Sequence, residues 1–205
     1  MFAWPSVRTI EPARQGEPGI GAVVYQNDRY PDAVFKWIVG ECRARGLVLS
    51  GVLQYPAFEG ADQDCDVVLE DIASGHRTRL FEDRGKGARG CRLDTAALLE
   101  AAMEIERSFD DTPSLLVLNK FGKVEAEGGG MCGVMAKALE RGIPVVIGVP
   151  ARNLKSWRNF ADGFSTELPE DTDRIADWLA RLGLGAAWRG APGAMPWTAI
   201  REGGG

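Results

Sequence analysis

The sequence SLLVLNKFGKVEAEGGGMC, residues 114–132, indicates how this chain folds. Its apolar start predicts a short buried strand over 114–118, and Asn119 and Lys120 are expected at the carboxyl end of that strand. Three glycines at 128–130 then lead into a stretch with helical periodicity. In an open α/β sheet, ligands bind beyond the carboxyl ends of the strands, and a glycine-rich turn before a helix offers backbone N–H groups to an anion. We therefore place the candidate site at this strand end.

Outward from this stretch, strand-like and helix-like segments alternate. This alternation predicts the α/β class, with a mostly parallel sheet that carries helices on both faces. Two segments around a glycine turn predict one antiparallel hairpin, and Asp94 is a predicted helix N-cap. The predicted strands are 21–26, 47–55, 114–118 and 144–149, the hairpin is 66–72 with 76–82, the helices are 31–42, 95–109, 131–141 and 171–182, and 152–164 is a loop with a short helical turn.

The length of 205 residues suits one domain with a sizeable core. We expect an irregular leader over 1–20, a single α/β domain over 21–182 and a Gly/Pro-rich tail over 183–205. In that tail, Trp188 and Trp197 indicate that part of it docks on the domain.

Composition excludes several classes of protein. Apolar residues make up 45% of the chain and charged residues 26%, which is typical of a soluble globular protein. A net charge of -5 argues against a general nucleic-acid binder. No apolar run reaches the roughly 18 residues of a membrane span, and the N-terminus lacks the regions of a signal peptide. Four scattered cysteines and a single histidine, His76, argue against a standard zinc site and indicate a cytoplasmic chain with reduced thiols.

The loop between the first predicted strand and the first predicted helix, residues 26–32, lies where a phosphate-binding loop would be expected. Such a loop needs the pattern G-x-x-x-x-G-K-[ST], whose glycines admit the phosphates, whose Lys contacts them and whose hydroxyl binds Mg²⁺. This loop has no glycine and no Lys, and its Asp28 and Asp32 would repel phosphate. The pattern occurs nowhere else in the sequence, which argues against a Walker-type nucleotide site.

Four segments carry a resemblance to known proteins: 21–25 (GAVVY), 45–52 (RGLVLSGV), 90–94 (GCRLD) and 119–125 (NKFGKVE). They resemble a bacterial family of uncharacterised function whose genes are often found near genes for molybdate uptake and molybdenum enzymes. That family in turn resembles P-loop nucleoside-triphosphatases of thermophilic origin. The resemblance covers roughly residues 20–180 and implies a three-layer, P-loop-NTPase-like fold with degenerate Walker motifs.

One departure from the triphosphatases concerns the end of the central strand. Where they resemble Asp-Glu-x-Gly-Lys-x-Glu, this chain has Asn119 and Lys120, while Gly122, Lys123 and Glu125 match. The resemblance therefore implies that a neutral amide replaces the carboxylate of the Mg²⁺ shell and that a cation replaces the acid that activates water. Without the phosphate loop as well, hydrolysis by the usual route should be absent or very slow. We expect no catalytic residue and no metal ligand.

These changes add positive charge near the predicted strand end, and the loop 84–92 adds four cations and three glycines without an acid. A small oxyanion such as molybdate, tungstate, sulfate or phosphate fits this chemistry. The alternative is that the cations are solvated and paired with Asp83, Glu125 or Glu127. The candidate ligand-binding residues are Asn27, Arg29, Lys86, Arg89, Cys91, Arg92, Asn119, Lys120, Lys123, Gly128, Gly129 and Gly130.

Two further sets of side chains have alternative interpretations. Cys91 and Cys132 lie in glycine-rich loops that lead into predicted helices, where a thiolate is favoured, and they would form a redox pair or soft ligands if the loops met. Buried packing is the ordinary alternative. Trp157 and Phe160 could stack on a ligand or cover the site, but a packing role is the favoured interpretation.

Three functions are compatible with the sequence. The first is a non-hydrolysing binding protein for a small oxyanion, with a place in molybdenum metabolism implied only by the resemblance. The second is a nucleotide-binding protein, or a slow nucleoside triphosphatase, with a remodelled site. The third is a regulator that binds a partner. We favour the first, with a small anionic ligand such as molybdate as its partner, no nucleic acid, no membrane and no certain cofactor. A homo-oligomer is left open.

Overall fold

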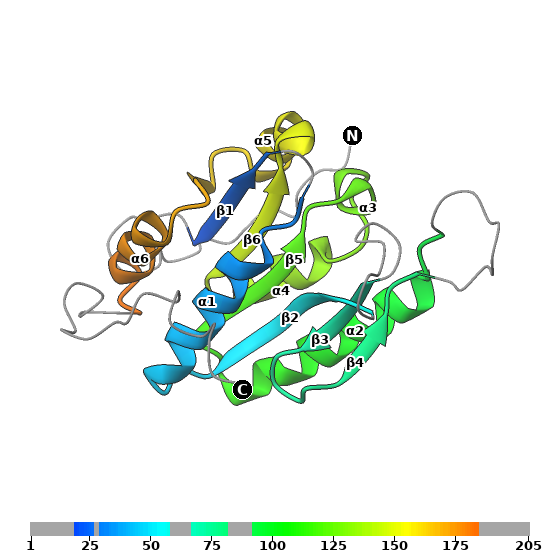
Figure 1. Ribbon diagram of the computed structural model, residues 1–205, viewed down its shortest axis with the longest axis horizontal. Coiled ribbons are helices and arrows are strands. Elements are labelled where there is room, and N and C mark those ends of the chain that lie inside the picture. Colours follow the sequence, from blue (N-terminus) through cyan, green and yellow to red (C-terminus); the bar gives the residue numbers. More distant parts are fainter. Residues whose placement is uncertain (1–18, 27–28, 58–66, 82–91, 185–205) are drawn as a thin grey trace, which may run out of the picture.

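The computed structural model describes residues 19–26, 29–57, 67–81 and 92–184. Within these ranges, seven strands form one sheet with the order β4-β3-β2-β5-β6-β1-β7 (Figure 1). The strands β2, β5, β6, β1 and β7 are parallel neighbours, while β3 is antiparallel to β2 and to β4. The strand bounds are Ile20–Tyr25 (β1), Leu49–Pro56 (β2), Val67–Asp71 (β3), Arg77–Arg79 (β4), Leu115–Lys120 (β5), Val145–Pro150 (β6) and Ser165–Leu168 (β7).

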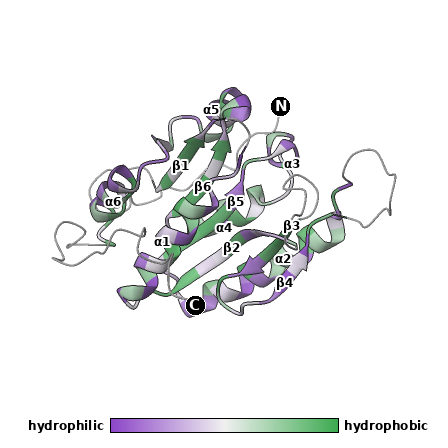
Figure 2. Ribbon diagram, viewed as in Figure 1, coloured by the Kyte–Doolittle hydropathy of each residue, from purple (hydrophilic) through white to green (hydrophobic). Residues whose placement is uncertain are grey.

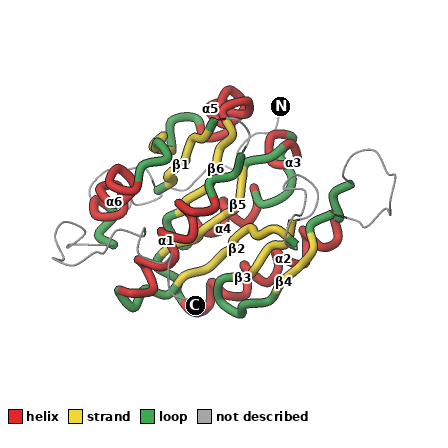
Figure 3. The backbone as a smooth tube through the Cα atoms, in the orientation of Figure 1, coloured by secondary structure: helices red, strands yellow, loops and turns green. Residues whose placement is uncertain are grey.

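Helices cover both faces of this sheet (Figure 3). They are α1 (Asp32–Ala44), α2 (Thr95–Ser108), α3 (Lys123–Ala126), α4 (Cys132–Glu140), α5 (Leu154–Ala161) and α6 (Thr172–Arg181), with short 3-10 turns at Phe109–Asp111 and Ala151–Asn153. None of the helices in the described ranges combines the length and the apolar character that a membrane crossing needs.

Each face of the sheet has its own hydrophobic cluster, and β5 contributes to both. Leu115 and Val117 pack in the cluster that contains α1 and α6, whereas Leu116 and Leu118 pack in the cluster that contains α2, α4 and α5. This alternation follows from the two-residue period of a strand. It explains why residues 115–118 of β5 are all apolar, and Figure 2 shows β1 and β6 coloured largely as hydrophobic.

The structure confirms the predicted α/β class, the mostly parallel sheet and the antiparallel hairpin. It also confirms Asp94 as the N-cap of α2, because the Asp94 side chain accepts a hydrogen bond from Ala97 N. Residues 1–18 of the predicted leader (1–20) and residues 185–205 of the predicted tail (183–205) lie outside the described residues, and β1 begins at Ile20, inside the predicted leader.

The structure differs from the prediction in several places, among them the short helix α3 in the predicted glycine-rich loop. Asn119 and Lys120 belong to β5 instead of following it, because a register shift after Leu118 lets Lys120 pair with Gly148. The loop predicted over 152–164 contains the eight-residue helix α5. The edge strand β7 was not expected, since its sequence STEL has one apolar residue and only β1 holds it in the sheet.

Candidate functional site

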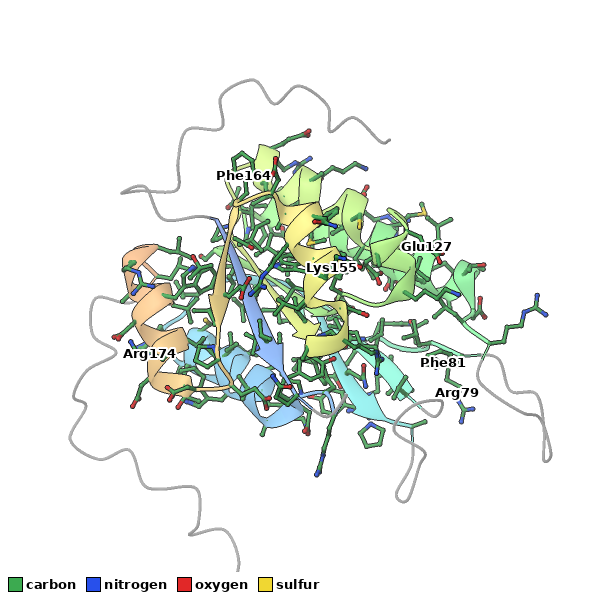
Figure 4. The ribbon with its side chains drawn as sticks, turned by 90° about the horizontal axis from the view of Figure 1, so that it is seen from above. Arg79, Phe81, Glu127, Lys155, Phe164 and Arg174 are labelled. Carbon is green, nitrogen blue, oxygen red and sulfur yellow. The ribbon has the colours of Figure 1, made fainter. Side chains whose placement is uncertain are left out.

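The chain connections diverge between the neighbouring strands β1 and β6. After β1 the chain enters α1, whose Phe35 and Ile38 pack on one face of the sheet. After β6 it enters α5, whose Trp157 and Ala161 pack on the other face. Such a topological switch point is where ligands bind in open α/β sheets. The site is therefore expected at the carboxyl ends of β1, β6 and the adjacent β5. Helix α5, whose Lys155 is labelled in Figure 4, begins shortly after β6 and runs back across a face of the sheet.

The ring of Tyr30, in the connection between β1 and α1, lies against the backbone of β6. A Cβ atom added to Gly148 would be 3.3 Å from Tyr30 Cε2, 3.3 Å from Tyr25 Cε1 and 2.7 Å from the backbone oxygen of Asn119. The Tyr30 ring also stacks on Phe35, with ring centroids 5.0 Å apart. Glycine at position 148 thus lets an aromatic ring and two strand ends come together at the switch point.

Three buried oxygen atoms near these strand ends have no hydrogen-bond partner in the part of the chain that the structure describes. They are the Tyr30 hydroxyl, Asn119 Oδ1 and Gln54 Oε1. Asn119 is only 8% exposed and Gln54 only 7%. Asn119 lies at the register shift of β5 between Leu118 and Lys120, and Tyr30 packs in the hydrophobic cluster on the face of α1. Buried polar groups are nearly always paired, so these atoms at the strand-end edge are candidates for contact with a ligand.

Burial also fixes the protonation state of Tyr30. The pKa of its phenol is raised well above the usual value, first by burial and then by the neighbouring Tyr25, Asp32 and Tyr55. The hydroxyl therefore keeps its proton at neutral pH and can donate it in a hydrogen bond.

The glycine-rich loop after β5 is organised around Glu125, whose side chain is 7% exposed. Its Oε2 accepts a hydrogen bond from Gly122 N at 2.9 Å, and its Oε1 accepts one from Met131 N at 3.2 Å. Met131 is the N-cap residue of α4, so the carboxylate lies at the positive end of that helix. The loop thus already contains an anion, supplied by the chain itself.

This arrangement gives a structural role to the three glycines that the sequence nominated as ligands. Gly128 N donates to Glu125 O and Gly129 N donates to Val124 O, both at 2.9 Å. Gly130 has a φ of 55°, and a Cβ there would collide with Glu125 Oε1. The prediction that these glycines bind an external anion is corrected for Gly128 and Gly129, because their N–H groups are engaged within the loop.

The predicted cationic ligands lie in different environments. Lys120 is half-buried at the end of β5, and Arg29 is exposed in the connection between β1 and α1, so both belong to the same edge of the sheet. The Lys123 side chain is 88% exposed, and its Nζ is 3.9 Å from Glu127 Oε1. Arg92 is exposed next to the start of α2. The remaining candidates, Asn27, Lys86, Arg89 and Cys91, lie outside the described residues.

Sequence reasoning missed several residues of this edge. Arg152 follows β6 directly, just as Asn119 and Lys120 follow the apolar part of β5, so the same strand-end rule would have found it. Tyr30 and Gln54 carried no signal, because no short pattern marks a buried oxygen without a partner.

For Cys132 the structure confirms buried packing and not the alternative of a thiolate. Burial, and to a lesser extent the nearby Glu125, raises the pKa of its thiol to about 12, and its Sγ lies 3.4 Å from Glu125 O as a hydrogen-bond donor. Packing roles are confirmed for Trp157 and Phe160, whose rings lie 5.1 and 5.4 Å from the ring of the buried Phe121. In the described ranges, His, Cys, Asp and Glu side chains form no group of three that could hold a metal ion.

The sheet order, the helices on both faces and the switch point define the three-layer α/β fold of P-loop nucleoside-triphosphatases. The crystal structure of THEP1 from the hyperthermophile Aquifex aeolicus matches it with a TM-score of 0.55 over 80% of this chain and 98% of that chain, at 13% identity. A solution structure of a human cancer-related nucleoside triphosphatase gives 0.49 over 73% and 86%, at 14% identity.

Residues 20–178 match the family described as proteins of unknown function, DUF2478, and the chain belongs to this family. It is also 27% identical over 159 residues to the molybdenum import ATP-binding protein ModC 2 of Bradyrhizobium diazoefficiens. That match covers 78% of this chain but only 18% of the relative, which is a much longer protein.

Proposed function

We propose that this chain is a non-hydrolysing binding protein for a small oxyanion. The ligand would lie at the strand-end site, which we define as Tyr30, Asn119 and Lys120. The observation that carries the proposal is the pair of buried oxygens on Tyr30 and Asn119 that lack partners among the described residues, next to the switch point of the sheet. The half-buried Lys120 supplies the positive charge that an anion needs at this edge.

The absence of hydrolysis is supported by the chemistry of the side chains at the end of β5. Activation of water requires a carboxylate or another base close to the reacting phosphate. The strand ends in an amide and an ammonium group, Asn119 and Lys120. Glu125, five residues beyond the strand, uses both carboxylate oxygens to accept backbone hydrogen bonds from Gly122 and Met131. Because both oxygens accept hydrogen bonds within the loop, the Glu125 side chain stabilises the loop and is not positioned to act as a base.

A compact ligand is supported by the position of Tyr30. A phosphate-binding loop surrounds its ligand with backbone N–H groups between the first strand and the first helix. Here the ring of Tyr30 lies in that connection and packs on Phe35 and against Gly148. This packing favours a single tetrahedral anion over an extended triphosphate chain.

A place in molybdenum metabolism is part of the proposal and is supported by the similarity to ModC 2, whose name describes a molybdenum import protein. Because the match covers 18% of that relative, the similarity does not identify the ligand of this chain.

Nucleotide binding is the second candidate function. It is favoured by the fold shared with THEP1 and by the similarity to a protein named as ATP-binding. A nucleotide bound at this edge would need Tyr30 to leave its position against Gly148.

Isothermal titration calorimetry separates the two functions. We expect heat of binding with molybdate, tungstate, sulfate or phosphate, and none with ATP or GTP, with or without Mg²⁺. Lys120→Ala should weaken oxyanion binding about tenfold or more, which corresponds to one lost charge contact. Lys137→Ala is the matched control, because Lys137 lies on α4 and pairs with Glu106. Turnover of ATP or GTP at an ordinary enzymatic rate would refute the proposal, as would the absence of heat with every oxyanion.

A further inference from the structure

Helix α2 carries apolar side chains on two opposite sides. Its inner side packs on the sheet through Ala101, Ala102 and Ile105, which are buried. Its outer side carries Leu99 and Met103, which are 62% and 47% exposed. These two residues are four positions apart, so their side chains are neighbours on one face of the helix. An amphipathic helix places polar side chains on the face turned away from the core, and a large apolar pair there is typical of an interaction surface.

Two charged residues lie on the same outer face. Glu100 comes three residues before Met103 and Arg107 comes four residues after it, and both are exposed. This helical spacing places the three side chains in one stripe along α2. In the part of the chain that the structure describes, no ion pair engages Glu100 or Arg107. The stripe therefore has an acid towards the start of the helix, a base towards its end and Met103 between them.

A stripe of this kind is complementary to itself. Glu100 and Arg107 are about 4.5 and about 6 Å from Met103 along the helix axis, on opposite sides of it. If a second α2 packs antiparallel with Met103 at a twofold axis, Glu100 of each helix faces the partner's Arg107. Leu99 then packs on the apolar stem of the partner's Arg107. A parallel pair would instead bring like charges together, so the charges favour the antiparallel orientation.

The apolar and the charged residues contribute differently to such a pair. Removing Leu99 and Met103 from water supplies the attraction between the two copies. Exposed ion pairs add little affinity, but they select the orientation, because like charges that are brought together repel each other. One pair of helices buries an area at the low end of protein interfaces, so the association should be weak and concentration-dependent.

We infer that the outer face of α2 is a self-association surface, on which a second copy of this chain packs its own α2 antiparallel in a symmetric dimer. The second copy is the occupant that the charges favour, since a symmetric interface uses the same patch on both subunits and this stripe matches itself after half a turn. The inference does not depend on the proposed function.

Sedimentation equilibrium of the full chain tests whether the dimer exists. We expect the average mass to rise from that of a monomer towards that of a dimer as the protein concentration is raised to about 1 mM. The double variant Leu99→Gln with Met103→Gln keeps a high helix propensity and should raise the Kd of the dimer at least about tenfold. A monomer at every concentration would overturn the inference, as would a dimer that this variant leaves unchanged.

Exchange of the two charges tests the antiparallel orientation. Glu100→Arg alone places a base against the partner's Arg107, and Arg107→Glu alone places an acid against the partner's Glu100. Each variant by itself should therefore raise the Kd at least about tenfold. An equimolar mixture of the two variants should recover the original Kd, because one chain then presents two bases and the other presents two acids.

Arg174→Glu is the matched control for the exchange of charge. It makes the same substitution as Arg107→Glu at an exposed position of α6 and should leave the Kd unchanged. Thermal unfolding checks that each variant is folded. If the mixture associates no better than the single variants, or if Arg174→Glu weakens the dimer as much as Arg107→Glu, the antiparallel pairing of α2 is wrong.

Discussion

At the scale of single residues, Glu125 explains features of the loop that the sequence assigned to an external ligand. Its carboxylate accepts from Gly122 N and Met131 N. It also requires glycine at 130, where any Cβ would collide with Oε1. The residues from 122 to 131 therefore form one hydrogen-bonded unit with a buried carboxylate at its centre.

Gly130→Ala should destabilise the protein strongly. The substitution combines a positive φ of 55° with a collision against a buried carboxylate, and we expect a loss of about 3 kcal/mol in the free energy of unfolding. Urea denaturation measures this loss. Gly128→Ala is the control, because its φ is also positive but its Cβ would meet no atom within 4 Å, and it should cost only about 1 kcal/mol. Equal losses in the two variants would contradict the role assigned to Glu125.

The residue types at the site were partly predictable. Asn119 and Lys120 were nominated because polar residues after a buried strand mark a candidate ligand-binding edge. Gly128 and Gly130 both have positive φ, which accounts for glycine at these two positions. Their use could not be predicted, because a sequence pattern does not say whether the anion at a helix N-terminus is a ligand or a side chain of the same loop.

At the scale of elements, the best predictions were those with a local physical signal. Asp94 was identified as the N-cap of α2 because its side chain can accept from the first turn of a helix. β7 had no such signal, and it exists because β1 offers it a parallel edge. Helix α5 was hidden for a similar reason. Its apolar face is narrow, with Trp157 and Ala161 buried, so the stretch reads as largely polar.

Asp94→Ala tests the contribution of a single cap. It removes the hydrogen bond to Ala97 N and should lower the free energy of unfolding by about 1 kcal/mol. Asp111→Ala is a control at an exposed acid after the same helix, and it should change stability by less than about 0.5 kcal/mol. Chemical denaturation of both variants gives the comparison. A similar small effect in both would show that α2 does not depend on its cap.

At the scale of the whole molecule, the core holds ionisable groups in their neutral forms. Burial raises the pKa of Cys42 to about 11 and that of Cys132 to about 12. These groups belong to the clusters on the two opposite faces of the sheet. The raised pKa values of these two thiols therefore depend on the packing of helices against both faces of the sheet.

The protein should lose stability at alkaline pH. In the unfolded chain the two thiols ionise near their ordinary pKa of 9.0, whereas in the folded protein they stay neutral up to about 11 and 12. The stabilisation they provide is complete below pH 9 and is lost as the pH rises through this interval. Urea midpoints at pH of about 8 and about 10.5 measure the loss.

The double variant Cys42→Ala with Cys132→Ala serves as the control for this effect. Its midpoint at neutral pH should be lower because two buried side chains are shortened, but its decline with pH should be shallower. An unchanged decline would mean that other groups cause the alkaline loss. Tyr30 is one such group, because its raised pKa acts in the same direction.

The architecture as a whole was predictable from the alternation of apolar segments, and the switch point was not. Periodicity at residues 115–118 indicates a strand buried on both faces, but it does not say which neighbours that strand takes. The placement of β6 between β5 and β1 depends on contacts between segments far apart in the chain. The location of the candidate site follows from that placement. The sequence could therefore indicate this location only through Asn119 and Lys120 at the end of one strand.

The carboxylate of Glu125 makes the turn before α4 independent of its surroundings. If the backbone N–H groups of this turn were bound by an external anion, the turn would lose those hydrogen bonds whenever the anion was absent. Here the acceptor is the carboxylate of Glu125, seven residues before α4 begins. The turn should therefore keep its shape whether or not an external anion is bound. A ligand that binds at the neighbouring strand ends would therefore meet a turn whose hydrogen bonds do not depend on it.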